Sequence, residues 1–186
     1  DLTAFRKVPV NKKILGEIAL DCLPNIYQLF IQSTDATFYE EQFETNLYQA
    51  RKLIEEIYSD DEKLYFCSLS YKTIVYKGLM LPNAIKEFYL DLKSPNFRSS
   101  ICVFHQRFST NTHPRWHLAQ PFRLLAHNGE INAIRGNRNW VKARSSKFKS
   151  PRIPKIQDFK ELVNEKGSDS SALDNMIEIL INGGVK

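Results

Sequence analysis

Cysteine is scarce in this chain of 186 residues, and long apolar runs are missing. Cys22, Cys67 and Cys102 are odd in number and form no Cys-x-x-Cys pair, which argues against a disulfide framework and against a zinc knuckle. No stretch approaches the ~18 apolar residues of a membrane span, and residues 1–6 lack the basic and then apolar build of a signal peptide. We therefore expect a protein of a reducing compartment, either cytoplasmic or inside an organelle such as a plastid, with no membrane partner.

Common ligand motifs are missing as well. The sequence has no glycine-rich phosphate loop, no dinucleotide fingerprint and no Gly-x-Ser-x-Gly elbow. Its four histidines invite a metal hypothesis, but Pro114 breaks the helix that His113 and His117 would need to share a face. No cysteine or acid completes a ligand set of suitable spacing, so we expect no metal site.

The positive charge of the chain is unevenly distributed. The net charge is +5, yet residues 131–157 hold eight basic residues and no acid, which leaves 18 basic against 21 acidic residues elsewhere. The eight are Arg135, Arg138, Lys142, Arg144, Lys147, Lys149, Arg152 and Lys155. Such a block either forms a solvated helix face and loop or contacts an acidic partner such as nucleic acid. The length and the apolar fraction of 42% fit one globular domain over residues 1–186.

Helices are predicted where apolar residues recur three and four apart and where start and stop signals agree. The expected positions are a short helix or turn before Pro24 and helices over 40–58, 82–93, 131–143 and 168–182. Gly136 weakens the fourth of these, and we expect it to permit close backbone packing. In the last helix the repeating apolar residues are Leu173, Met176, Ile177 and Leu180.

Strands are predicted over 25–32, 63–70, 73–77 and 100–108, which are rich in β-branched and aromatic residues. The second and third of these suggest a hairpin. In the last one, Ile101, Val103, His105 and Arg107 share one face, because strand side chains alternate. An arginine that continues an apolar row either leaves the core at the end of the strand or is neutralised by an anion. A structural salt bridge and a ligand carboxylate both stay open for Arg107.

Two further positions are candidates for chemistry. The Asn128-Gly129 pair suits a hairpin turn, because both residues tolerate positive φ. It also suits an oxyanion hole, in which a backbone N–H and the Asn128 side-chain amide donate to developing negative charge. Asp169 either caps its helix or, beside an arginine, binds a substrate ammonium. An acid and an arginine together would recognise an α-amino acid.

Five motifs, in order and spacing, resemble one family, the class II glutamine amidotransferase domain found at the N-terminal end of the glutamate synthase large subunit. They are HQRFSTNT at 105–112, LAQPFRLL at 118–125, HNGEIN at 127–132, GNRNW at 136–140 and SDSSALDN at 168–175. The resemblance implies an α+β fold of the N-terminal-nucleophile-hydrolase type, a four-layer αββα sandwich. It makes residues 1–186 the C-terminal part of such a domain, with the opening strands missing.

In that family an N-terminal cysteine, with its own α-amino group as the base, hydrolyses L-glutamine to glutamate and ammonia for the reductive amination of 2-oxoglutarate. The resemblance implies that Arg107 binds the glutamine carboxylate and that Asp169 holds its α-amino group. It also implies that Asn128 and Gly129 stabilise the oxyanion, with Thr110 as a lesser substrate-binding candidate. The whole enzyme of the resemblance uses FMN and an iron–sulfur cluster, neither of which is expected in this segment.

The sequence departs from a working enzyme of this family in one respect. It begins at Asp1, and none of its cysteines is N-terminal, so the nucleophile and the free amine are absent. We expect the chain to be inactive alone and to need the rest of a glutamate synthase chain: an upstream segment with the cysteine and a downstream synthase domain. A small subunit is a further candidate partner. The alternatives are a non-catalytic amino-acid-binding module and, less favoured, a basic nucleic-acid-binding domain.

Overall fold

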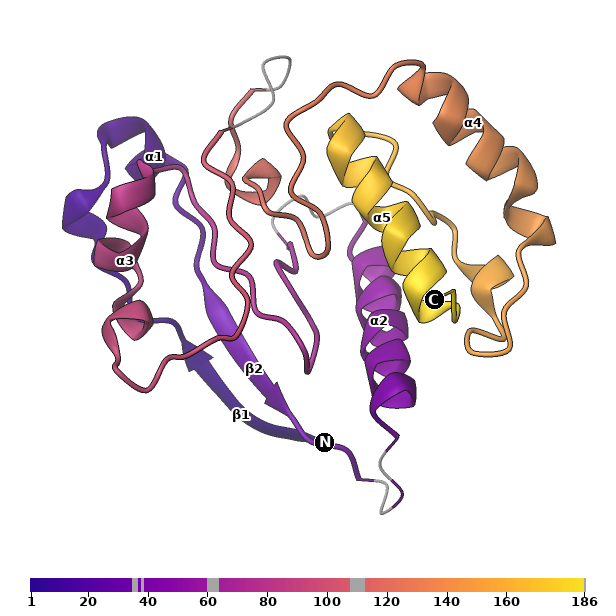
Figure 1. The fold of residues 1–186 in the computed structure, drawn as a ribbon, viewed down its shortest axis with the longest axis horizontal. Helices are drawn as coiled ribbons and strands as arrows, with labels where there is room; N and C mark the ends of the chain where they lie inside the picture. The colour runs from indigo at the N-terminus through magenta and orange to yellow at the C-terminus, as the bar shows by residue number, and fades with distance from the viewer. Residues whose placement is uncertain (35–36, 38, 60–63, 108–112, 186) are drawn as a thin grey trace.

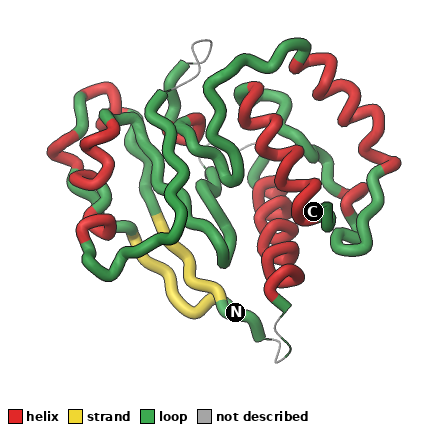
Figure 2. The backbone as a smooth tube through the Cα atoms, in the orientation of Figure 1, coloured by secondary structure: helices red, strands yellow, loops and turns green. Residues whose placement is uncertain are grey.

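The computed structural model describes residues 1–34, 37, 39–59, 64–107 and 113–185, and it mixes helices with a small sheet (Figures 1 and 2). The α-helices are α1 (Glu17–Asp21), α2 (Glu40–Ile57), α3 (Ile85–Phe88), α4 (Ile134–Arg144) and α5 (Asp169–Asn182). Short 3-10 helices cover Lys12–Ile14, Pro82–Ala84, Leu90–Lys93, Trp116–Leu118, Ser145–Lys147 and Ile156–Asp158. In the part that is described, every helix is too short or too polar to cross a membrane. The predicted α+β class is confirmed.

The sheet consists of β1 (Leu2–Lys7) and β2 (Tyr27–Ile31), which pair antiparallel. Phe5 stands opposite Leu29 in the ladder and stacks on Tyr27, with ring centroids 4.9 Å apart. Two strands alone are marginally stable in water. The sheet is tied to the 3-10 helix at Leu90–Lys93 by an ion pair of 2.5 Å between Arg6 and Asp91. β2 confirms the strand predicted over 25–32, whereas β1 was not predicted.

Two clusters of buried apolar side chains form the core. One gathers around α1, α3 and the end of β1, at the left of Figure 1. Its buried members are Val8, Ala19, Phe88, Tyr89 and Trp116. The other lies between α2, α5 and the chain that leads into α5, and it is drawn at the right. Its buried members are Tyr48, Ile153, Ile156, Phe159, Leu162, Val163, Ala172 and Ile179.

The helix α5 buries a polar stripe rather than the row expected from its apolar residues. Side chains four residues apart, on one helical face, are 1%, 1%, 6% and 9% exposed; they are Ser170, Asp174, Glu178 and Asn182. Leu180, a member of the expected apolar row, is 44% exposed. The predicted helix is confirmed. Buried polar groups need partners, and Arg51 of α2 supplies one for Glu178.

Ion pairs join α2 and α5. Arg51, which is 2% exposed, donates to Glu178 at 2.7 Å and to Glu55 at 2.9 Å. Arg123 reaches the same two carboxylates, at 3.1 Å to Glu55 and 3.7 Å to Glu178. Burial alone disfavours the charged guanidinium of Arg123, but Tyr65 and the surrounding carboxylates raise its pKa, so it stays protonated. Two arginines therefore share two glutamates in the interior.

The predicted strands over 63–70, 73–77 and 100–108 are corrected by the structure. Their described residues, 64–70, 73–77 and 100–107, belong to no strand; Lys63 and Phe108 lie outside the description. In the hairpin, serine hydroxyls take the backbone amides: Ser68 accepts from Val75 at 3.2 Å, and Ser70 accepts from residues 72 and 73. Among the described residues, no strand pairs with the 100–107 segment, and Ile101 is 80% exposed.

The helix α4 begins at Ile134, three residues later than predicted. The residue before it, Ala133, has a φ of 56°, which is left-handed and delays the helical conformation. Gly136 lies on the exposed side of α4, and a Cβ built there meets nothing within 4 Å. The expectation that Gly136 permits close backbone packing was therefore wrong.

Candidate functional site

The N-terminus of α5 meets residues 127–131, which we call the 127–131 bend. The Asp169 carboxylate accepts a hydrogen bond from the Ile131 amide at 2.6 Å and another, also 2.6 Å, from the amide of the next residue in α5. Ser168 caps the helix, because its hydroxyl accepts from the Ser171 amide at 3.1 Å. Asp169 is half-buried. The Asp169 carboxylate joins the helix to the bend. The sequence had suggested that Asp169 caps the helix, but Ser168 is the N-cap.

Two other side chains hold the start of the bend. The Gln120 side chain brackets the His127 backbone: its Oε1 accepts from the His127 amide at 2.7 Å, and its Nε2 donates to the His127 carbonyl at 2.8 Å. Asp174 of α5 accepts from the backbone amides of residues 123, 124 and 125 at 3.3, 2.8 and 3.0 Å. The His127 ring lies 3.2 Å from the Ser170 hydroxyl. The bend is thus anchored to α5 and, through Gln120, to the segment that precedes it.

Asn128 and Gly129 lie between the anchored residues His127 and Ile131, and their N–H donors are exposed. Both residues are exposed, and among the described residues neither the Asn128 side chain nor the Gly129 amide has a hydrogen-bond partner. Gly129 does not have a positive φ; of the described glycines, Gly184 has one. A Cβ at Gly129 would meet the His127 imidazole at 3.0 Å. A side chain at this position would crowd the His127 ring, so the constraint comes from the ring contact rather than from a left-handed turn. No described strands flank the bend as a hairpin would demand.

Arg107 is not brought to this bend by any contact among the described residues. It is exposed, and its amide donates to His105 Nδ1 at 3.1 Å. Within that part of the chain it also forms no ion pair, so the structure supplies no partner for the salt bridge considered from the sequence. Thr110 lies outside the described residues. The structure joins Asp169 to the bend that carries Asn128 and Gly129, whereas carboxylate binding by Arg107 stays a prediction.

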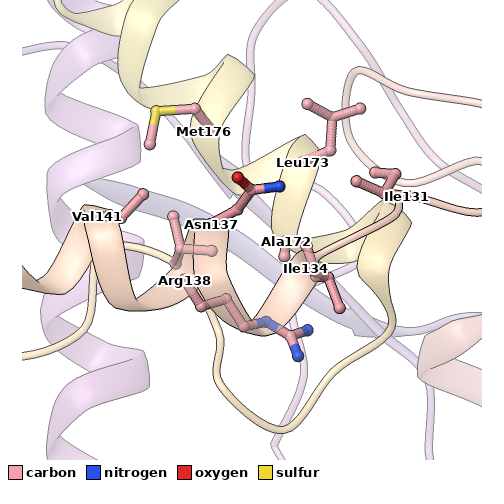
Figure 3. Close-up of a pocket in the computed structure, with 9 residues that line it drawn as sticks. Ile131, Ile134, Asn137, Arg138, Val141, Ala172, Leu173 and Met176 are labelled. Atoms are coloured by element: carbon pink, nitrogen blue, oxygen red, sulfur yellow. The ribbon is translucent and has the colours of Figure 1, made fainter.

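A cavity of about 220 Å³ lies between α4 and α5 (Figure 3). Its lining is mostly apolar and includes Ile131, Ile134, Val141, Leu173 and Met176. Arg138, also in the lining, donates to the carbonyls of Gly167 at 2.7 Å and Ser168 at 3.0 Å and so ties α4 to the start of α5. An apolar lining does not match the charged ends of an amino acid. Ile131 of the bend is part of the lining, and we assign no ligand to the cavity.

The cysteines are poorly suited to nucleophilic attack. Burial raises the pKa of the Cys67 thiol, although Lys77 and Arg123 nearby act in the opposite direction. The Cys22 thiol donates to the carbonyl of Ile18 at 3.1 Å. A reactive cysteine needs a lowered pKa, and no described contact supplies one. Among the described residues, no three His, Cys, Asp or Glu side chains gather around a metal position.

A buried lysine lies near the approach to the bend. Lys77 is 3% exposed, and its Nζ donates to the Tyr65 hydroxyl and to the His117 carbonyl, both at 3.2 Å. Burial lowers its pKa to about 8, while Cys67 acts in the opposite direction. The ammonium also lies 5.2 Å from the centre of the Phe122 ring. The charged form of Lys77 thus lowers the stability of the fold, and this cost depends on pH.

Half of the basic block at 131–157 is engaged within the chain. Besides Arg138, Lys142 pairs with Glu165 at 2.9 Å and Arg152 pairs with Glu41 at 2.6 Å. The Arg144 guanidinium lies 4.6 Å from the centre of the Trp140 ring. These contacts favour the solvated helix face over a nucleic-acid surface.

Sequence reasoning missed the residues that hold the bend. Gln120 lies within the family motif at 118–125, but a single glutamine in a loop follows no periodicity, so no role was predicted for it. Asp174 and Ser170 belong to the buried polar stripe of α5, and their spacing of four was visible in the sequence. A polar row at helical spacing is usually a solvated face, so that signal pointed the wrong way.

Comparison with known proteins identifies the family. The family model for class-II glutamine amidotransferases matches residues 1–186. Similar proteins include the ferredoxin-dependent glutamate synthase of Cyanidium caldarium, 43% identical over 185 residues, and ferredoxin-dependent glutamate synthase 1 of Arabidopsis thaliana, 45% identical over 189. The glutamate synthase [NADPH] large chain of Azospirillum brasilense is 42% identical over 183. Each match covers 97% of this chain but only 12%, 11% and 12% of the respective relative, so the chain spans about an eighth of their length. The chain belongs to the class-II glutamine amidotransferases.

Proposed function

We propose that these residues form the glutamine-binding and oxyanion-stabilising part of the amidotransferase domain of a glutamate synthase, which hydrolyses L-glutamine to glutamate and ammonia for the reductive amination of 2-oxoglutarate. The observation that carries the proposal is the 127–131 bend. Asn128 and Gly129 expose two donors that have no partner among the described residues, and Asp169 is hydrogen-bonded to Ile131 of the same bend. Donors aimed at a developing oxyanion are often the largest contribution to acyl-transfer catalysis.

Each group has a distinct role in this proposal. The Asn128 side-chain amide and the Gly129 amide donate to the oxygen of the glutamine carboxamide as it becomes an oxyanion. Asp169 has two carboxylate oxygens, each of which already accepts one backbone amide at 2.6 Å. A carboxylate offers about four acceptor positions, so Asp169 keeps capacity for the substrate ammonium. Arg107 binds the substrate carboxylate, and Thr110 lines the same end of the substrate.

The attacking group is assigned to an upstream segment of a longer chain, at an N-terminal cysteine. Burial raises the pKa of the Cys67 thiol, and Cys22 donates to a helix carbonyl. The raised pKa disfavours the Cys67 thiolate that a nucleophile would need. We therefore propose that the 186-residue chain alone does not hydrolyse glutamine.

The remaining parts of the proposal concern the complete enzyme. Its partners are L-glutamine, the upstream cysteine-bearing segment, a downstream synthase domain and a small subunit. We place FMN and the iron–sulfur cluster in other parts of the longer chain, because Cys22, Cys67 and Cys102 do not gather into a ligand set among the described residues. We propose the four-layer αββα sandwich for the complete domain and a location in the cytoplasm or, as in relatives whose names include "chloroplastic", a plastid.

Ammonia release tests the proposal. A longer version of this chain that includes the upstream cysteine segment is expected to release ammonia from L-glutamine, and the 186 residues alone are not. Absence of release from the longer chain would rule out the amidotransferase role. Release from the 186 residues above that of a sample lacking protein would rule out the assignment of the nucleophile. A non-catalytic amino-acid-binding module would bind glutamine in calorimetry but release no ammonia in either form.

A further inference from the structure

We infer that Gln120 is a positioning residue for the oxyanion donors and acts on them through the His127 backbone. The inference rests on the function proposed above and adds a residue that touches neither substrate nor reacting atoms. Gln120 accepts from the His127 amide at 2.7 Å and donates to the His127 carbonyl at 2.8 Å. One side-chain amide thus satisfies both polar groups of a single residue, as a neighbouring strand would.

The surroundings keep this clamp in place. Gln120 is 8% exposed, and its neighbours Ala119 and Phe122 are 4% and 3% exposed. Water therefore has little access to replace the two hydrogen bonds if the side chain is changed. A buried backbone group that loses its partner costs about 1–3 kcal/mol, so the His127 peptide would move to find another partner.

The position of the bend depends on the hydrogen bonds at its two ends. Gln120 fixes His127 at one end, and Asp169 fixes Ile131 at the other, with a hydrogen bond of 2.6 Å. Between these points Asn128 and Gly129 have no described hydrogen bonds of their own. The two anchors consequently constrain where Asn128 and Gly129 can lie. Misplacement by about 1 Å is enough to cost on the order of 100-fold in rate.

Asp174 gives the approach to the bend a second support. Its carboxylate is 1% exposed and accepts from three consecutive backbone amides, those of residues 123–125. The three amides lie between Gln120 and His127 in the sequence. Asp174 offers an independent way to loosen the same bend without touching Gln120.

Gln120→Glu in the full-length enzyme tests the inference. The new carboxylate still accepts from the His127 amide but repels the His127 carbonyl, unless it is protonated and can donate. We expect kcat for glutamine hydrolysis to fall about 10-fold at pH 8.5 with KM within 3-fold of wild type, because the oxyanion donors act in the transition state. The ratio of variant to wild-type kcat is expected to recover several-fold toward pH 6, as the buried carboxyl becomes protonated.

The readout is the ratio at each pH, measured from 6.0 to 8.5. The titratable groups around the clamp are His127, Lys77 at the His117 carbonyl, and Asp169 and Asp174 of α5. Wild type and variant share these groups, so taking the ratio of their kcat values reduces the contribution of these groups to the pH dependence. Gln157→Glu is the matched control, since Gln157 is exposed. Its ratio is expected to stay near one across the range.

The outcomes separate this inference from the proposed function. A wild-type enzyme that releases no ammonia overturns both. A second outcome overturns the role of Gln120 alone. In it the wild type releases ammonia and Asn128→Ala is impaired, but the kcat ratio of Gln120→Glu equals that of Gln157→Glu at every pH. If Gln120→Glu does not fold, Asp174→Asn decides: a lower kcat at unchanged KM in folded protein supports the anchored bend, and wild-type kcat overturns it.

Discussion

Replacing Glu178 with glutamine tests whether the buried ion pairs between α2 and α5 stabilise the fold. Glu178 accepts from Arg51 at 2.7 Å, and the two side chains are 9% and 2% exposed. Removing one partner of a buried pair costs about 3–5 kcal/mol, because the other charge is left without compensation. Glu55 still contacts both arginines here, at 2.9 and 3.1 Å. We therefore expect the lower end, about 3 kcal/mol of unfolding free energy.

The assay is urea unfolding followed by circular dichroism, with thermal unfolding as a second readout. A loss of about 3 kcal/mol corresponds to a fall in Tm of roughly 6–12 °C for a chain of this size. Glu165→Gln is the matched control: Glu165 pairs with Lys142 at 2.9 Å, but the side chains are 56% and 72% exposed. Its unfolding midpoint is expected to match wild type, because solvent screens the pair. Equal effects of the two substitutions would refute the argument from burial.

Three further predictions concern Lys77, Gly136 and Gly129. Burial lowers the pKa of Lys77 to about 8, so the unfolded state binds more protons between that pH and the ordinary lysine pKa near 10.5. The stability of wild type should therefore rise relative to Lys77→Met by about 1.5 kcal/mol from pH 8.0 to 9.5, and a difference in urea midpoint that stays constant with pH would contradict this. Gly136→Ala should raise stability by up to about 1 kcal/mol, since α4 gains helix propensity in open space. Gly129→Ala makes the same chemical change against the His127 ring at 3.0 Å; it should lower glutaminase activity in the full-length enzyme, and equal activity of the two alanine variants would argue against the ring contact.

Local patterns were sufficient to predict the long helices but not the sheet. The helix α2 was predicted from apolar spacing, and α5 from its cap at Ser168 and its glycine stop. A strand, in contrast, needs a partner from elsewhere in the chain, and the 100–107 stretch finds none among the described residues. The serines at 68 and 70 add a local reason in the hairpin, because their hydroxyls take backbone amides. β-rich composition alone does not fix pairing.

The candidate site was predicted in part. Asn128, Gly129 and Asp169 came from turn and cap chemistry together with the family motifs, and a hydrogen bond from Ile131 joins the two regions. The anchoring by Gln120 was not predictable, because it is a single side-chain contact to backbone seven residues away. The burial of the polar stripe of α5 was not predicted, since the arginines that pair with Glu178 come from distant segments.

Steady-state glutaminase kinetics of Asn128→Ala in the full-length enzyme test the central claim most directly. Removal of one oxyanion donor is expected to lower kcat by about 100- to 1,000-fold, with KM for L-glutamine within a few-fold of wild type, because the donor acts on the transition state rather than on bound substrate. A folded Asn128→Ala enzyme with wild-type kcat would contradict the assignment of the 127–131 bend as the oxyanion site.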